Sequence, residues 1–157
     1  LFTVYGPWGR PDMAPMLFAK SILDKKPIDI FNFGKMKRDF TYIEDVVEGI
    51  SRCSHKPAKQ NQIFDAYNPD KSTSFAPYRI FNIGNSQPIE LLRFIELLED
   101  SLGVKSIKNF KPIQPGDVEA TAANTNLIES WIGFKPSTSI EKGVDKFAKW
   151  YLDYYRN

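Results

Sequence analysis

Two arginines stand where their side chains could bind an anion. Arg10 ends a loop that contains Gly6 and Gly9, and Arg38 begins a short extended segment with Asp39 beside it. A guanidinium binds a phosphate or a carboxylate through two parallel hydrogen bonds, so these residues indicate a site for a polyanionic ligand. The alternative is that Arg38 and Asp39 form surface ion pairs, which contribute little to stability. Residue type and spacing leave both interpretations open.

Other chemically active groups are scarce. His55 is the only histidine and Cys53 the only cysteine, so we expect no metal site and no internal disulfide. Both lie in a predicted helix, where we expect Cys53 to be a buried thiol and His55 a solvated or C-terminal capping residue. Tyr67 and Lys71 have the spacing of a Tyr-x-x-x-Lys pair, but Pro69 argues against the helix that such a pair needs.

The composition suits one domain with a sizeable core, since the chain has 157 residues of which 42% are hydrophobic. The net charge is only +2, so we expect no nucleic-acid partner, which would require a concentrated basic face. The sequence has no apolar stretch of transmembrane length, and we expect no membrane partner. A single cysteine is compatible with a reducing compartment, which makes the cytoplasm the default expectation.

The segment Leu1–Met13 is predicted to be a short buried strand that ends abruptly in a rigid loop. Phe2 and Val4 occupy alternate positions, and the sequence Gly6–Gly9 then combines two glycines with a proline. A break from strand to loop at the carboxyl edge of an α/β sheet is a usual place for a ligand. Because no turn or cap precedes this strand, we expect the chain to begin within a domain.

Apolar periodicity predicts alternating helices and strands, and hence an α/β fold. The predicted helices are Pro15–Lys25, Ile43–His55, Ile89–Leu102, Thr125–Trp131 and one from Thr138 onward; the predicted strands after the first are Ile28–Phe33, Arg38–Tyr42, Arg79–Ile83 and Ser106–Lys111. Thr41 with Glu44 and Thr138 with Glu141 have the spacing of capping boxes. Pro88 is expected at the first position of its helix.

Residues 56–77 form the least regular part of the chain. This stretch is too long for an ordinary connection, and we interpret it as a mobile surface loop because the pattern on both sides remains α/β. A turn is predicted at Gln114–Asp117. The last helix is expected to bury one face, formed by Val144, Phe147, Ala148, Tyr151 and Tyr155.

Five strings carry a family resemblance: FTVYGPWGRPDMA at 2–14, RDFTYIEDVVEGI at 38–50, NIGN at 82–85, QPGDV at 114–118 and GFKPSTSIEKGVDKFAKWY at 133–151. They resemble the UDP-glucuronate 4-epimerases, which belong to the extended short-chain dehydrogenase/reductase superfamily of NAD-dependent nucleotide-sugar enzymes. The YGPWGRPDM string is quite specific, whereas RDF-type and NIGN-type segments occur across nucleotide-sugar epimerases and dehydratases. The resemblance extends over nearly the whole chain outside residues 56–77.

The resemblance implies that residues 1–157 are one C-terminal region, namely the substrate-binding lobe with far-edge strands of a Rossmann sheet. The opening strand and Arg79–Ile83 would supply those far-edge strands. The family's glycine-rich NAD-binding loop and its catalytic Tyr-x-x-x-Lys pair would lie upstream, so no catalytic residue is assigned here and the chain alone is expected to be inactive. The implied cofactor is NAD, held mainly by that N-terminal part, and the implied partners are a UDP-sugar and further copies in a homo-oligomer.

The resemblance also assigns binding roles. Thr3 and Arg10 would hold the uronate carboxylate, and Arg38 the diphosphate. The remaining implied contacts are Ile28, Asp29, Ile30 and Phe31 with uracil, Gln114 and Asp117 with the phosphates and ribose, and Phe2, Tyr5, Gly6 and Pro7 with the nicotinamide. Asn124 stands where the family has an acidic residue, and we expect asparagine still to cap the following helix.

The implied reaction interconverts UDP-glucuronate and UDP-galacturonate through oxidation at C4, rotation of the 4-keto sugar and return of hydride to its other face. Polysaccharide biosynthesis would be the usual setting for this family. Three alternatives stay open: a UDP-glucose 4-epimerase, a UDP-glucuronate decarboxylase, and a non-catalytic module for nucleotide-sugar binding or oligomerisation. Trp8 and Arg10 favour the uronate epimerase.

Overall fold

A computed structural model describes residues 1–156 and has the α/β architecture that the sequence predicts. Its strands form a three-stranded sheet of β1 (Thr3–Tyr5), β3 (Lys37–Tyr42) and β4 (Pro88–Glu90), and a two-stranded sheet of β2 (Pro27–Ile30) and β5 (Ile107–Phe110). β1 runs parallel to β3 with Thr3 opposite Phe40, whereas β4 is antiparallel to β3. β2 and β5 are parallel, with Ile28 opposite Lys108.

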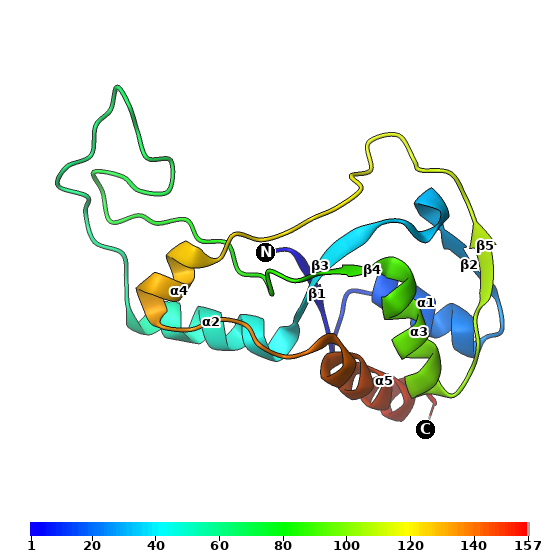
Figure 1. Ribbon diagram of the computed structural model, residues 1–157. Helices are drawn as coiled ribbons and strands as arrows, with labels where there is room; N and C mark the ends of the chain where they lie inside the picture. The colour runs from blue at the N-terminus through cyan, green and yellow to red at the C-terminus, as the bar shows by residue number, and fades with distance from the viewer. Residues whose placement is uncertain (157) are drawn as a thin grey trace.

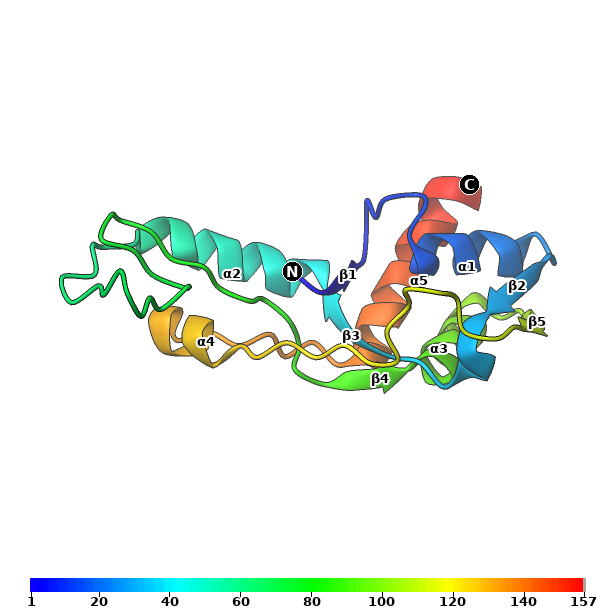
Figure 2. The ribbon, with the colours of Figure 1, turned by 90° about the horizontal axis from the view of Figure 1, so that it is seen from above.

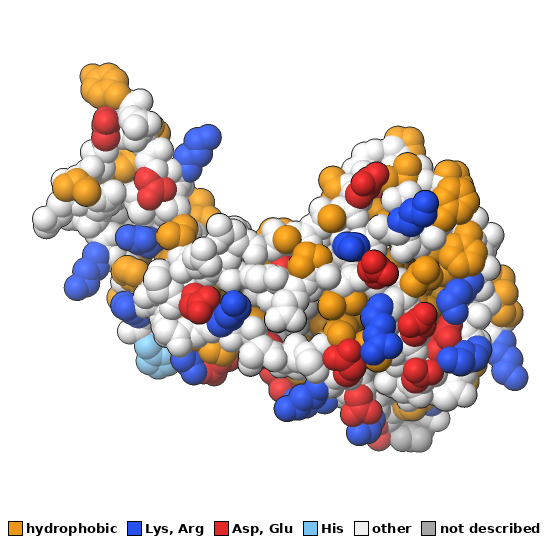
Figure 3. Space-filling model, in the orientation of Figure 1, with side chains coloured by type: hydrophobic (Ala, Val, Ile, Leu, Met, Phe, Trp, Pro, Cys, Tyr) orange, Lys and Arg blue, Asp and Glu red, His pale blue; other side chains and the backbone are white. Residues whose placement is uncertain are grey.

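The helices fall into two groups in space (Figures 1 and 2). They are α1 (Ala14–Leu23), α3 (Leu91–Leu102) and α5 (Ile140–Arg156) around the main body, and α2 (Ile43–His55) with α4 (Asn126–Ile132) toward the far end. On the face shown in Figure 3, acidic and basic side chains intermingle over the main body. In the described residues, no helix is both long and apolar enough to cross a membrane.

The main core lies between the sheet of β1 and β3 and the helices α3 and α5. The rings of Phe40 and Phe94 stack with centroids 4.3 Å apart, and Tyr5 meets both rings edge-on. On α5 the predicted inner face is confirmed from Val144 to Tyr151. Tyr155 is an exception, because it is 47% exposed on the last turn of the helix.

A second, smaller core joins α2 to α4 through Val46, Ile83 and Ile128. Ile83 is buried in this core, but it does not belong to a strand. The prediction of a strand at Arg79–Ile83 is wrong, because this segment is irregular apart from an isolated bridge between Thr73 and Arg79. The alternation of its apolar residues reflects contacts with helices on one side. No strand of the described residues extends alongside it to form a ladder, so the expected second far-edge strand is absent from this fold.

The capping predictions fail in detail although both helices form. The hydroxyl of Thr41 is fully buried without a hydrogen-bond partner, and the residue before α2 is Tyr42. Before α5, the hydroxyl of Ser139 rather than that of Thr138 accepts a hydrogen bond from the backbone N–H of Lys142, at 3.3 Å. Asn124 behaves as expected, since its side-chain oxygen accepts a hydrogen bond from the backbone N–H at the start of α4, at 3.2 Å.

Two predicted elements have different boundaries in the structure, because a turn or a short strand takes the place of some of their residues. The strand expected over Ile28–Phe33 ends at Ile30, and a 3₁₀ turn follows in which Asn32 and Phe33 have positive φ angles of 49° and 51°. Pro88 begins strand β4 rather than the helix, which starts at Leu91. Where the sequence predicts helices that end before Gly103 and Gly133, both glycines adopt the left-handed conformation of a C-terminal cap.

Residues 56–77 contain no helix or strand and project from the body as the large loop in Figure 1. Its base is closed by Trp131 of α4, whose ring lies 4.8 Å from the charged groups of both Lys56 and Arg79. Tyr67 is fully exposed on this loop and forms no helical pair with Lys71, as predicted. The mobility of the loop remains a prediction.

The single histidine and the single cysteine of the chain have ordinary surroundings. His55 is exposed, and its Nδ1 lies 2.8 Å from the carbonyl oxygen of Ser51, at the C-terminal end of α2 as expected. Cys53 is half-buried rather than fully buried, and that burial raises the pKa of its thiol. Within residues 1–156, no group of three or more metal-binding side chains occurs.

Candidate functional site

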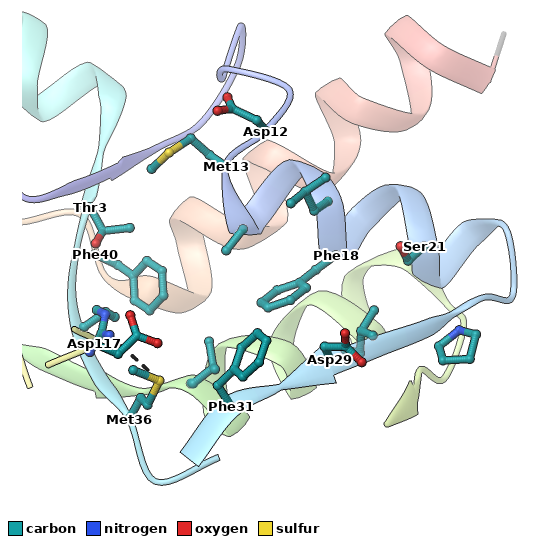
Figure 4. Close-up of a pocket in the computed structure, with 16 residues that line it drawn as sticks. Thr3, Asp12, Met13, Phe18, Ser21, Asp29, Phe31, Met36, Phe40 and Asp117 are labelled. Carbon is teal, nitrogen blue, oxygen red and sulfur yellow. Dashed lines mark hydrogen bonds between the residues drawn. The ribbon is translucent and has the colours of Figure 1, made fainter. Parts of the chain in front are cut away.

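A cavity of about 600 Å³ opens between the start of β1 and β3 on one side and α1 and β2 on the other. Six of its lining residues are ones to which the sequence assigns substrate contacts: Thr3, Ile28, Asp29, Phe31, Arg38 and Asp117. Figure 4 shows the rings of Phe18 and Phe31 facing each other inside the cavity. Thr3, Phe40 and Asp117 lie on one side of these two rings, together with Arg38, which is next to Met36, and Asp29 and Ser21 lie on the other side.

The Arg38 side chain is held by its own neighbourhood. Its Nη1 donates to the carbonyl oxygens of Lys37 at 2.9 Å and Glu119 at 3.3 Å, and its Nη2 lies 3.8 Å from the sulfur of Met36. No ion pair of the described residues includes Arg38, so the surface-pair interpretation is wrong for this residue. A guanidinium has five N–H donors, and several remain for a ligand.

The Asp29 carboxylate is engaged by the neighbouring strand β5 and the residue after it. Lys111 donates to it at 2.7 Å and Asn109 at 2.8 Å. The hydrogen bond from Lys111 lowers the pKa of Asp29, and the hydrogen bond from Asn109 lowers it by a smaller amount, so this carboxylate stays charged. The carboxylate of Asp29 is therefore already occupied by partners from β5 and the residue after it.

A second cavity, of about 490 Å³, lies beside the first and shares Met13 with it. All the residues expected near a nicotinamide line it, namely Phe2, Tyr5, Gly6 and Pro7. Gly6 has a φ angle of +137°, and a Cβ there would lie 2.4 Å from Cγ2 of Ile43. Any residue other than glycine would therefore force the backbone to move. The Tyr5 ring itself points into the core, where burial raises the pKa of its phenol.

These features fit a flat ring system at the second cavity. Phe2, Val4 and Pro7 supply apolar surface, and the two glycines of the loop bring the backbone close without side chains. Trp8, between those glycines, has a positive φ of 61°, and its exposed ring packs against Trp150 and Tyr154 of α5, with centroids 5.7 and 4.8 Å away. The loop is therefore tied to the C-terminal helix.

Three predicted contacts lie outside the first cavity. Arg10 lines the second cavity instead, and its guanidinium pairs with Asp12 at 2.6 Å. Ile30 is completely buried, with its carbonyl oxygen accepting from the backbone N–H of Lys111, and Gln114 is exposed at the predicted turn. The roles suggested for these residues remain predictions.

The sequence missed several residues that the fold brings to the site. Phe18 and Ser21 come from the face of α1 that its periodicity marks, but nothing in the pattern distinguishes a cavity wall from a core. Asp39 was considered only as a surface ion-pair partner of Arg38, which is wrong because it is completely buried. Strand alternation could have indicated this, since neighbours in a strand point to opposite faces.

A family model described as the NAD dependent epimerase/dehydratase family matches residues 1–86. The chain is 50% identical over 155 residues to Protein CapI of Staphylococcus aureus, which covers 99% of this chain and 46% of that protein. It is 48% identical over 156 residues to a Rhizobium meliloti (strain 1021) protein named Probable UDP-glucuronate 4-epimerase, again with 99% and 46% covered.

The fold agrees with these relatives. The structure of UDP-glucuronic acid 4-epimerase from Bacillus cereus, in complex with UDP-glucuronic acid and NAD, matches with a TM-score of 0.76 at 30% identity, over 98% of this chain and 44% of that one. The chain thus spans less than half the length of the relatives it matches. The family resemblance expected from the motifs is confirmed, and the chain belongs to the NAD dependent epimerase/dehydratase family.

Proposed function

We propose that this chain is the UDP-sugar-binding portion of an NAD-dependent UDP-glucuronate 4-epimerase, acting with an NAD-binding portion outside this sequence. The observation that carries the proposal is the 600 Å³ cavity, in which Arg38 and Thr3 lie to one side of two phenylalanine rings that face each other. That combination suits a ligand with a charged diphosphate and a flat, neutral base. The names of the relatives from Rhizobium meliloti and Bacillus cereus support the same substrate class.

Within this proposal, the residues of the chain bind and orient the substrate. Uracil lies against the edge of β2 and the ring of Phe31, and Arg38 binds the diphosphate with the N–H groups that its backbone partners leave free. Because the guanidinium is already held by two carbonyl oxygens, little conformational entropy is lost when it binds phosphate. Thr3 then faces the sugar from the opening strand.

NAD, when bound, would accept hydride from C4 of the sugar and return it. The residues of this chain that would hold it are Phe2 and Pro7, with the backbone of Gly6, at the second cavity. Because the two cavities share Met13, a sugar in the first and a ring in the second would be neighbours. The chain's part in the reaction is to place the sugar there and to restrict water and alternative poses.

Arg10 supports a second candidate, a UDP-glucose 4-epimerase. The uronate assignment uses Arg10 to bind the sugar carboxylate, but in this structure its guanidinium pairs with Asp12 and lines only the second cavity. A neutral hexose would leave that ion pair undisturbed. The uronate remains the first proposal because both residues are exposed, and an exposed pair exchanges partners at little cost.

Calorimetric titration of the chain with UDP, UDP-glucuronate and UDP-glucose tests the proposal, with Trp8 fluorescence as a second signal. We expect binding of UDP and a preference for the uronate sugar. Arg38→Gln should weaken UDP binding about tenfold or more, since it removes a charged donor. Arg52→Gln is the matched control, because Arg52 pairs with Glu48 on α2 away from both cavities.

Each result has a defined meaning. A preference for UDP-glucose would replace the first candidate by the second. A wild-type chain that binds no UDP, or an equal loss in the Arg38 and Arg52 variants, would contradict the assignment of the cavity.

A further inference from the structure

Asp39 is a buried carboxylate that joins strand β3 to two distant segments of the chain. Its exposed fraction is 0%, and it accepts three backbone N–H groups. Oδ1 accepts from Asn85 at 3.0 Å, and Oδ2 accepts from Ser86 at 3.1 Å and from Ala123 at 2.8 Å. Such an arrangement of charge-assisted hydrogen bonds is strong and directional, because the acceptor is a carboxylate.

One of these two segments forms part of the cavity. Residues 117–123 follow β3 closely: the backbone N–H of Lys37 donates to the carbonyl of Glu119 at 2.8 Å, and that of Thr121 donates to the carbonyl of Lys37 at 3.2 Å. The backbone N–H of Asp39 donates to the hydroxyl of Thr121 at 3.2 Å. At the front of this segment, Asp117 lines the cavity.

The same segment also holds Arg38. Its Glu119 carbonyl accepts the hydrogen bond from Nη1 of Arg38, so a shift of this segment moves one of the two carbonyls that fix the guanidinium. Asp39 is the next residue along β3, and alternation along the strand points its side chain to the opposite face. A single strand therefore presents Arg38 to the cavity and secures, through Asp39, the segment that supports Arg38.

There is little space for the segments to separate and repack. At Gly84, a Cβ would lie 2.4 Å from the Cβ of Ala123 and 3.1 Å from Oδ2 of Asp39. The chain at Gly84 and the chain at Ala123 thus meet directly beside the carboxylate. Replacing one carboxylate oxygen by an NH₂ group would set that group against a backbone N–H, whichever way the amide is turned.

We propose that Asp39 is a positioning residue for the diphosphate end of the cavity, acting through residues 117–123 on Arg38. The inference deepens the proposed function and rests on it. Asp39 does not touch the ligand. Its loss should therefore weaken the binding of ligands that carry the diphosphate and spare the binding of the nucleoside alone.

The test compares UDP with uridine on the wild-type chain and on Asp39→Asn, by calorimetry, with amide hydrogen exchange of residues 117–123 as a second measurement. We expect Asp39→Asn to weaken UDP about tenfold, the size of one charge-assisted hydrogen bond, without changing the uridine constant. Exchange within residues 117–123 should accelerate. Thr121→Val, which removes only the hydroxyl acceptor, should act in the same direction and also serves if Asp39→Asn does not fold.

The matched control is Glu99→Gln. Glu99 is also a buried carboxylate with several donors, and neither it nor those donors line the cavity. It should leave the ratio of the UDP and uridine constants, and the exchange of residues 117–123, at wild-type values. Equal losses of UDP and uridine binding, or unchanged exchange in both test variants, would overturn the inference while the proposed function stands. A wild-type chain that binds no UDP would overturn both.

Discussion

Glu99 should make the free energy of unfolding fall as the pH becomes acidic, and the substitution Glu99→Gln should remove this pH dependence. It lies near the end of α3 with an exposed fraction of only 3%. The backbone N–H of Ser106 donates to it at 3.2 Å, its hydroxyl donates as well, and the ammonium groups of Lys105 and Lys108 lie beside it. Burial alone would raise the pKa of Glu99, but the donors led by Lys108 outweigh it and lower the pKa to about 2.

The sign and size follow from that pKa. Because the folded pKa lies below the ordinary value of 4.5, the unfolded chain takes up the proton first, and stability is lost as the pH falls from about 4.5 toward 2. The shift corresponds to on the order of 3 kcal/mol of unfolding free energy at neutral pH. Above pH 5 this contribution is fully present and should not vary.

Urea unfolding of the wild type and Glu99→Gln, at several values between pH 3 and pH 7, measures this contribution. The variant should be less stable by on the order of 3 kcal/mol at pH 7, and the difference should shrink steadily below about pH 4.5 as Glu99 of the unfolded wild-type chain takes up a proton. Glu96→Gln is the control, because Glu96 is exposed on the same helix and its long ion pair with Arg93 contributes little to stability. A difference between wild type and Glu99→Gln that stays constant across this pH range would refute the reasoning, since it would reflect packing rather than charge.

Two further predictions concern the core and the sugar end of the site. Gly143→Ala should lower the unfolding free energy by about 1–3 kcal/mol in the same urea assay, because its Cβ would lie 1.9 Å from the hydroxyl of Tyr5; an unchanged midpoint would show that the ring moves freely. Arg10→Ala, in an enzyme that includes the NAD-binding portion, should raise KM for UDP-glucuronate about tenfold while the affinity for UDP alone changes little. Equal losses would make Arg10 a phosphate-binding or structural residue.

The elements that the sequence predicts well are those whose pattern is local. α2 begins and ends where apolar spacing and the following Lys-Pro indicate. The opening strand ends at Tyr5, because the glycine and proline that follow exclude a regular continuation. The segment Arg79–Ile83 has the same kind of alternation as a strand. Whether such a segment is paired depends on another strand alongside it, which is tertiary information that the segment itself does not carry.

The site was predictable to the extent that it consists of short motifs. Thr3, Arg38 and Asp117 come from separate strings, and the fold brings them to one cavity. The role of Asp39 could not be read in the same way, because its partners Asn85 and Ala123 lie 46 and 84 residues further along the chain. Hydrogen bonds over such separations have no signature in residue spacing.

Arg38 and Asp39 show why a charged pair on a strand is poorly described as an ion pair. Adjacent strand residues point to opposite faces, so a basic and an acidic neighbour are directed apart and meet different surroundings. Here the arginine meets a cavity and the aspartate meets three backbone donors in the interior. A buried carboxylate without such donors would be costly, whereas one that is fully hydrogen-bonded fixes the segments around it. By our proposal, the aspartate adds to the contacts that keep the neighbouring arginine in one place, because it secures the segment whose Glu119 carbonyl accepts from Arg38.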